Sequence, residues 1–245
     1  MGPLLLFGLV TAGSLITSLT GLGGGTLILA GLLMVYPPEL AIPLHSFTQL
    51  SANALRTGLF YKSVNWRVVG AYALLMVPAA WLGAMIFDLI NPSWLKLLVG
   101  SFILISLYPF SFTPKGEPKL KTFVFLGAFS GFLGVFVGAV GPLVTPFFNR
   151  LKILREGMIA TKSAGQAVLQ LSKIFAFWGA TSVNFNDLKD NVLILVLGTL
   201  VGVGISIPIS RKISDKKFEL IINVLLGLIA VKVIYEGISG LFSGK

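Results

Sequence analysis

Long apolar runs, separated by short polar or charged stretches, fill this chain from one end to the other. The runs that we expect to be helices cover residues 3–19, 26–36, 41–60, 68–87 and 94–110, and then 123–135, 143–148, 157–178, 188–209 and 218–238. Runs of this kind recur at lengths that cross about 30 Å of hydrocarbon, although 26–36 is too short to do so alone. The pattern predicts an all-α polytopic membrane protein with about 8–10 helical segments.

The expected helix over 41–60 differs from the others because it carries a polar stripe. At about 100° per residue, His45, Gln49, Asn53 and Arg56 fall within an arc of roughly 80°. Four glycines precede it within residues 21–25, inside an apolar run. In a membrane protein, a polar stripe beside a glycine-rich break in a helix is how a polar ligand site is built.

The second half of the chain repeats the first at an offset of 117 residues. The polar and glycine positions that meet are Gly21 and Gly138, Gly24 and Gly141, His45 and Lys162, Ser46 and Ser163, Gln49 and Gln166, Asn53 and Gln170, and Arg56 and Lys173. The alternative is a coincidence among small and apolar residues. We therefore predict one membrane domain over 1–245, with repeats over about 3–112 and 120–240 and a basic linker at 113–121.

Composition supports the membrane assignment and removes several other classes. The 245 residues are 55% hydrophobic and 11% charged, with a mean hydropathy of +0.91 and no cysteine. An ordinary soluble domain is about 25% charged. Without cysteine there are no disulfides, thiol catalysis or cysteine-ligated metals. The net charge of +10 sits mostly in loops, which is typical of cytoplasmic membrane loops and argues against nucleic-acid binding.

The loop charges predict an orientation in the cell membrane. The basic loops are 62–67, 115–121, 150–155 and 211–217, whereas those at 39, 88 and 187–190 are acidic or weakly charged. If the basic loops lie inside, both termini lie outside. Each glycine-containing pair of short helices then returns to its own side, as two short crossings or as a re-entrant hairpin. The two halves are inverted relative to each other, with Arg56 towards the inner mouth and Lys173 towards the outer mouth.

The polar residues of the repeats suit an anion. Helices that start after the glycines present free N–H groups and a partial positive charge, and amides and cations also donate to oxyanions. The predicted substrate-binding residues are Gly23, Gly24, Gly25, His45, Gln49, Asn53, Arg56, Gly141, Lys162, Ser163, Gln166, Gln170 and Lys173. Alternatively, the glycines only permit tight helix packing, and Arg56 and Lys173 snorkel to the interface. For His45 the alternatives are a hydrogen-bonded polar residue or a proton-coupling group.

Acidic residues are informative by their positions. All nine Asp and Glu fall at or near loops or helix ends, whereas cation transporters usually keep a carboxylate inside the membrane. An anionic substrate is therefore favoured. No paired carboxylates, histidine cluster or nucleophile elbow indicates an enzyme, and the glycines match neither a dinucleotide fingerprint nor a Walker loop. We expect no cofactor and no metal.

Several motifs resemble the TauE/SafE family of sulfite exporters and toluenesulfonate uptake permeases. The first half is similar to it at Gly21-Leu-Gly-Gly-Gly-Thr-Leu-Ile, at 41–56 and at Val64-Asn65-Trp66-Arg67, and the second half at Gly138-Ala-Val-Gly-Pro-Leu-Val-Thr-Pro and 160–173. The resemblance implies passive or ion-coupled movement of sulfur-containing anions such as sulfite, thiosulfate or a sulfonate. We expect a secondary carrier working by alternating access, with H⁺ or Na⁺ as candidate coupling ions; the alternative is an anion channel lined by the same donors.

Overall fold

The protein is a bundle of helices in the computed structural model, which describes residues 2–20, 24–107, 116–186, 188–209 and 216–243. Its ten described α-helices are α1 (Pro3–Thr20), α2 (Gly24–Leu33), α3 (Pro38–Leu59), α4 (Trp66–Phe87), α5 (Pro92–Leu107), α6 (Leu120–Val137), α7 (Gly141–Phe148), α8 (Arg155–Ala180), α9 (Lys189–Ile209) and α10 (Lys216–Phe242). No strand occurs among the described residues. The predicted all-α class is confirmed, and no predicted helix end differs from the observed one by more than four residues.

The order of helices repeats along the chain. Helix α1 covers 3–20 and α6 covers 120–137, so both ends differ by 117 residues (120 minus 3 and 137 minus 20). The starts of α2 and α7, at 24 and 141, and of α3 and α8, at 38 and 155, keep the same offset. The spacing that relates the polar positions of the sequence therefore also relates the helices that carry them.

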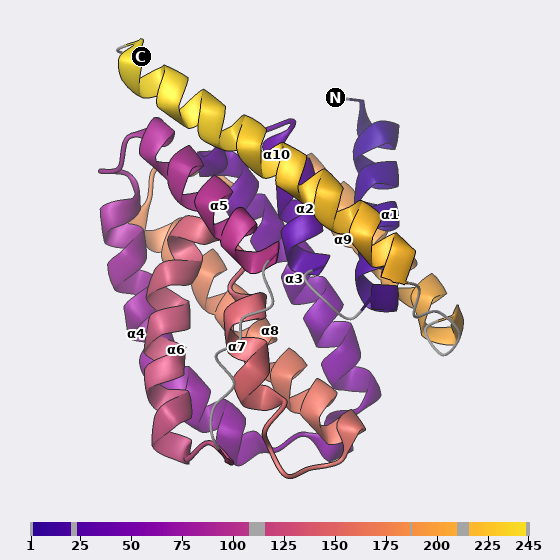
Figure 1. The fold of residues 1–245 in the computed structure, drawn as a ribbon. Coiled ribbons are helices and arrows are strands. Elements are labelled where there is room, and N and C mark those ends of the chain that lie inside the picture. The colour runs from indigo at the N-terminus through magenta and orange to yellow at the C-terminus, as the bar shows by residue number, and fades with distance from the viewer. Residues whose placement is uncertain (1, 21–23, 108–115, 187, 210–215, 244–245) are drawn as a thin grey trace.

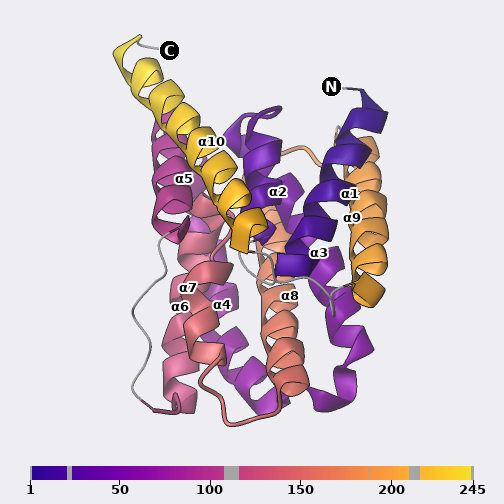
Figure 2. The same ribbon diagram turned by 45° about the vertical axis from the view of Figure 1, so that its right-hand side comes forward.

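Two short helices, α2 and α7, fold back beside the helices that precede them. Helix α1 runs from the end where the chain begins to about half the height of the bundle, and α2 returns towards that end (Figures 1 and 2). Helices α6 and α7 make the same hairpin from the opposite end. With 10 and 8 residues, α2 and α7 are about 15 and 12 Å long. Each is too short to cross about 30 Å of hydrocarbon.

Each hairpin packs on a helix of the other half. Helix α1 lies along α9, and α6 lies along α4, while α5 pairs with α10. The α4–α6 contact is backbone to backbone, because a Cβ at Gly127 would overlap the Tyr72 carbonyl oxygen and one at Gly131 that of Met76. In the α1–α9 contact, a Cβ at Gly202 would overlap the Thr11 carbonyl oxygen. Small residues at such positions let membrane helices approach closely.

Helices α3 and α8 cross between these packed pairs and run antiparallel. The chain after α3 lies at the start of α8, where the Asn65 N–H donates to Thr161 Oγ1 at 2.9 Å. The chain after α8 returns to the first half of α3, where the rings of Phe185 and Phe47 pack edge to face with centroids 5.5 Å apart. Asn65 also caps α4 by accepting from the Val68 N–H. The segment that follows each of the two helices therefore contacts the other helix, near both ends of the crossing.

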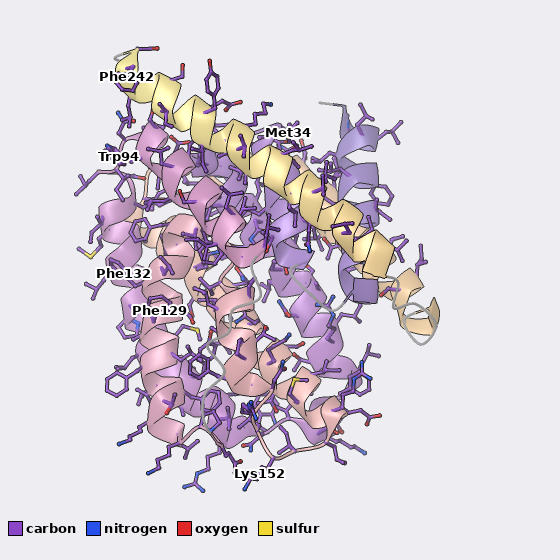
Figure 3. The ribbon with its side chains drawn as sticks, viewed as in Figure 1. Met34, Trp94, Phe129, Phe132, Lys152 and Phe242 are labelled. Atoms are coloured by element: carbon purple, nitrogen blue, oxygen red, sulfur yellow. The ribbon has the colours of Figure 1, made fainter. Side chains whose placement is uncertain are left out.

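The outer faces of the bundle are apolar. Four helical segments among the described residues are long and apolar enough to cross a membrane: Trp66–Phe87, Leu120–Val137, Lys189–Ser206 and Asn223–Phe242. Phe129 and Phe132 project outward from α6 with 51% and 43% of their surface exposed (Figure 3). Helices α3 and α8 are not among the four because their polar stripes lower their hydropathy. The apolar helices face outward, and the two polar ones lie between them.

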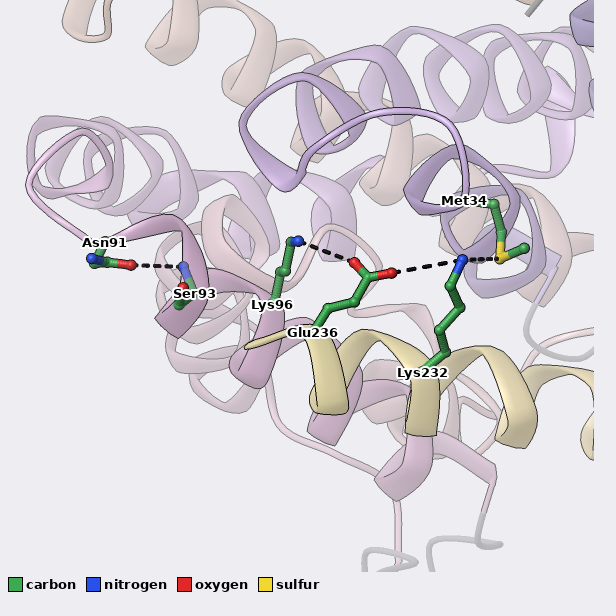
Figure 4. A network of polar contacts seen from close by, with 6 residues as sticks. All are labelled: Met34, Asn91, Ser93, Lys96, Lys232 and Glu236. Carbon is green, nitrogen blue, oxygen red and sulfur yellow. Dashed lines mark hydrogen bonds and ion pairs between the residues drawn. The ribbon is translucent and has the colours of Figure 1, made fainter. Parts of the chain in front are cut away.

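Charged side chains gather at both ends of the bundle. At one end, Lys152 lies 3.9 Å from Glu117 of the 116–119 segment, so this part of the basic linker meets the loop before α8 (Figure 3). At the other end, Glu236 of α10 pairs with Lys96 of α5 at 3.0 Å and with Lys232 at 3.6 Å (Figure 4). These pairs are partly or largely exposed, so each contributes little to stability. The basic segment at 211–217 lies mostly outside the described residues.

Candidate functional site

The polar stripe of α3 meets the first turn of α2. His45 is fully buried, and its Nε2 lies 2.8 Å from the carbonyl oxygen of Gly25. A Cβ built on Gly25 would lie 3.1 Å from Gln49 Oε1 and 3.4 Å from His45 Nε2. The glycine therefore gives these two side chains room against the backbone of α2. Gly24, where α2 begins, leaves the N–H groups of the first turn without partners inside the helix.

Lys173 of α8 reaches the tip of the other hairpin. Its side chain is fully buried, and Nζ donates to the Gly138 carbonyl oxygen at 2.9 Å and to Gln170 Oε1 at 3.2 Å. Gly138 ends α6 with φ +75°, a conformation that favours glycine. A Cβ there would lie 2.8 Å from Leu29 Cδ2 of α2. The tip of the second hairpin thus contacts the first hairpin, and Lys173 is anchored beneath it.

The antiparallel crossing pairs the basic residues of the two stripes in a defined way. His45 of α3 lies close enough to Lys173 of α8 for their charges to interact, and the same holds for Arg56 of α3 and Lys162 of α8. Each pair joins a position of one half to a position of the other. His45 and Lys173 form the buried pair, whereas Arg56 and Lys162 are half-buried near the start of α8.

Amide side chains fill the stretch between these two pairs. Gln166 Nε2 donates to the hydroxyl of Tyr72 on α4 at 3.3 Å. Asn53 Nδ2 donates to the carbonyl oxygen of Gln49 at 2.8 Å, so its amide nitrogen faces its own helix. Gln49, Asn53, Gln166 and Gln170 are all at least nine-tenths buried. The crossing is therefore polar along its length and enclosed by the surrounding helices.

Comparison of the sequence with family models identifies the protein family. The model described as sulfite exporter TauE/SafE matches residues 4–233 of the 245. The chain belongs to the TauE/SafE family. This family moves sulfur compounds across membranes, so the protein is a membrane-embedded transporter. No curated protein sequence and no solved structure matches the chain.

Most of the residues expected to bind substrate in this TauE/SafE protein lie along the α3–α8 crossing. The structure brings together Gly25, His45, Gln49, Gln170 and Lys173 around the two hairpin tips, and sets Arg56 and Lys162 apart near one end. Gly141 begins α7 with no atom within 4 Å of a built Cβ, and Ser163 is buried in α8. Gly23 lies outside the described residues.

One expectation about position is wrong. Lys173 was expected at a mouth of the transport path, with snorkelling to the interface as the alternative, but its side chain is fully buried. The ammonium group bonds to the hairpin tip because the Gly138 carbonyl, freed by the end of α6, needs a donor. Arg56 is half-buried and also has an interaction partner.

The sequence analysis of this TauE/SafE protein did not predict two residues of the site. Tyr72 lies in an apolar stretch of α4 and has no polar neighbour at helical spacing to single it out. Gly138 was noted as the counterpart of Gly21, but its carbonyl as the acceptor for Lys173 was not foreseen. Among the described residues no Asp or Glu is fully buried, although Oε2 of Glu39, in the first turn of α3, is buried without a hydrogen-bond partner. The enclosed charge of the crossing is therefore positive, which suits an anion.

Proposed function

We propose that this TauE/SafE protein is a secondary transporter of small sulfur oxyanions or organosulfonates, and that the anion binds where α3 and α8 cross. The observation that carries the proposal is the buried amine of Lys173, whose two hydrogen-bond partners are uncharged acceptors and which forms no ion pair with a described Asp or Glu. A buried cation without a counter-ion is costly, and an anion would relieve that cost.

Lys173 has a donor to spare for such an anion. An ammonium group carries three N–H donors, and described partners take two of them, at Gly138 and Gln170. A charged donor in an enclosed site binds an oxyanion more strongly than a neutral one. The amides of Gln49 and Gln166, together with the first-turn N–H groups of α2, supply further donors.

The arrangement of the helices supports alternating access between two inverted repeats. The hairpins enter from opposite ends and meet at about half height, and each packs on a helix of the other half. A two-fold axis in the membrane plane would relate these two packing contacts to each other. Transporters built from inverted repeats bind substrate near mid-membrane.

We also propose that the protein spans the plasma membrane. The basic end of the bundle then faces the cytoplasm. Cysteines introduced at Lys119, beside the Lys152–Glu117 pair, and at Ser243, after α10, test it with a membrane-impermeant thiol reagent in intact cells. Ser243→Cys should label from outside, and Lys119→Cys only after permeabilisation. Labelling of both from one side would contradict the inverted arrangement.

Flux into proteoliposomes tests the transport function itself. Uptake of labelled thiosulfate, sulfite or an arylsulfonate should saturate with concentration and show counterflow, since a carrier exposes its site to one side at a time. Current that rises with concentration without saturating would instead show a channel. Lys173→Gln should weaken uptake, whereas Lys232→Gln, at an exposed position of α10, serves as the control for removal of a lysine.

A further inference from the structure

Polar atoms at the start of α2 lie buried without hydrogen-bond partners. Within the part of the chain that the structure describes, His45 Nδ1, Gln49 Nε2 and Thr26 Oγ1 have none. Buried polar atoms in native proteins are nearly always paired, so each such atom calls for an explanation. His45 is fully buried, Gln49 is 7% exposed, and both side chains lie against Gly25. These atoms therefore mark a place that a ligand completes.

The hydrogen bond to Gly25 fixes the tautomer of the His45 ring. The Gly25 carbonyl oxygen can only accept, so Nε2 carries the proton in the bond of 2.8 Å. In the neutral ring the unpartnered Nδ1 is then a bare acceptor. An oxyanion next to Nδ1 would face a lone pair and be repelled. If Nδ1 gains a proton, the same atom becomes a charged donor to the anion.

The charges around His45 decide when it can gain that proton. Helices α2, α8 and α9 pack on α3, with lesser contacts from α5 and α6, and α2 contains no titratable side chain. Of the charged groups that the structure describes on these helices, Lys173 of α8 is the one that acts on His45. A second positive charge beside that ammonium is unfavourable while the site is empty, and becomes favourable only when an anion offsets both.

We infer that His45 is the proton-coupling residue of this transporter, and that a divalent sulfur oxyanion such as thiosulfate or sulfite crosses together with one proton held on Nδ1. This inference rests on the proposed function. Lys173 alone neutralises a monovalent sulfonate, which needs no further charge. A divalent anion leaves one negative charge, which the protonated His45 balances. The proton comes from water on the side to which the site is open and returns to water on the other side.

Proton uptake on binding tests the inference with thiosulfate and an arylsulfonate as probes. Neither anion changes its charge between pH 5 and 8, so any pH dependence belongs to the protein, and histidine titrates in that range. In detergent-solubilised protein with a pH indicator, thiosulfate should take up about one proton per anion, and its Kd should rise by about tenfold per pH unit by linkage. The arylsulfonate should take up none, and its Kd should stay flat.

Variants assign the proton to an atom. His45→Gln keeps a donor for Gly25 but cannot titrate, so thiosulfate binding should weaken and lose its pH dependence, while the pH profile of arylsulfonate binding should not change. Lys173→Arg, whose charge is fixed, should keep the pH dependence. Gln49→Ala should weaken both anions without changing the slope against pH.

Three outcomes would overturn the inference. One is thiosulfate binding that is independent of pH in the unmodified protein. Another is a slope that persists in His45→Gln and is lost in Lys173→Arg, which would place the proton on Lys173. The third is failure of both anions to bind at all, in which case the proposed function falls as well; the first two leave that function standing.

Discussion

The two hairpin tips occupy equivalent places in the two halves but are chemically different. The first half contributes Gly25 to a tip that touches His45 and Gln49, two neutral side chains with unpartnered atoms. The second half contributes Gly138 to a tip whose carbonyl oxygen holds the charged Lys173. The first tip has buried polar atoms without hydrogen-bond partners, whereas the second has a lysine that is already hydrogen-bonded. The two halves thus place different side chains at equivalent hairpin tips.

Because α3 and α8 cross antiparallel, their basic residues form two pairs that differ in composition and burial. His45 and Lys162 occupy corresponding positions of the two halves, as do Arg56 and Lys173, yet His45 interacts electrostatically with Lys173, and Arg56 with Lys162. One pair then combines a histidine and a lysine in a fully buried place, and the other combines an arginine and a lysine that are half-buried near the start of α8. The following experiments would break or sharpen this contrast, from the largest expected effect to the smallest.

Removal of the anchored charge should have the largest effect. Lys173→Gln deletes a charged donor from an enclosed site, and hydrogen bonds of that kind are worth about 1.5–3 kcal/mol. We expect the apparent Kd for thiosulfate to rise by about 10- to 150-fold, measured by equilibrium binding or by half-saturation of uptake. Protein yield must be matched with Lys232→Gln. A Kd within twofold of the unmodified protein would show that the second tip is structural only.

The glycine of the second tip should matter for stability more than its neighbour does. Gly138→Ala forces a side chain into φ +75° and against Leu29, which costs about 1–3 kcal/mol of folding free energy. Gly141→Ala enters open space at the start of α7 and should leave the melting temperature unchanged. Thermal unfolding in detergent compares the two. Equal melting temperatures would mean that the backbone at Gly138 is not as constrained as its φ indicates.

Truncation of Gln49 should separate affinity from stability. Gln49→Ala removes a buried amide nitrogen that has no partner in the empty site, so the free energy of unfolding should stay equal or rise slightly. Loss of the same donor should weaken anion binding by about fivefold, within the range of one neutral hydrogen bond. Melting temperatures with and without thiosulfate measure both effects. A variant that is less stable when empty would contradict the role of Gln49 as an unfilled donor.

The half-buried pair should show the smallest effect. Arg56→Gln removes a charge nearer the end of α3, where solvent and salt screen it. We expect about a two- to threefold weaker half-saturation at low ionic strength and no difference at 0.5 M salt. Uptake at several salt concentrations measures this. An effect as large as that of Lys173→Gln would place the anion between Arg56 and Lys162.

The apolar runs were enough to predict the helices and their order. The offset of 117 residues that relates the glycines and amides also separates the starts of α2 and α7 and of α3 and α8, and the repeat itself stays a prediction. The position of Lys173 could not be predicted, since the same apolar surroundings suit a snorkelling lysine or a buried one. The pairing of His45 with Lys173, and of Gln166 with Tyr72, depends on how two helices slide along each other. That offset is set by tertiary packing, which spacing within one helix does not record.

The tight contact between α1 and α9 also constrains how the protein is made. Helix α1 ends at residue 20, and α9 begins at residue 189, so 168 residues separate them in the chain. At about 5–20 residues per second, roughly 8 to 34 seconds of synthesis pass before α9 emerges. During that interval the face of α1 that packs on α9 has no partner from α9. Lipid, the insertion machinery or a neighbouring helix must cover it, and a ribosome that stalls after the first half leaves a product that cannot complete its fold.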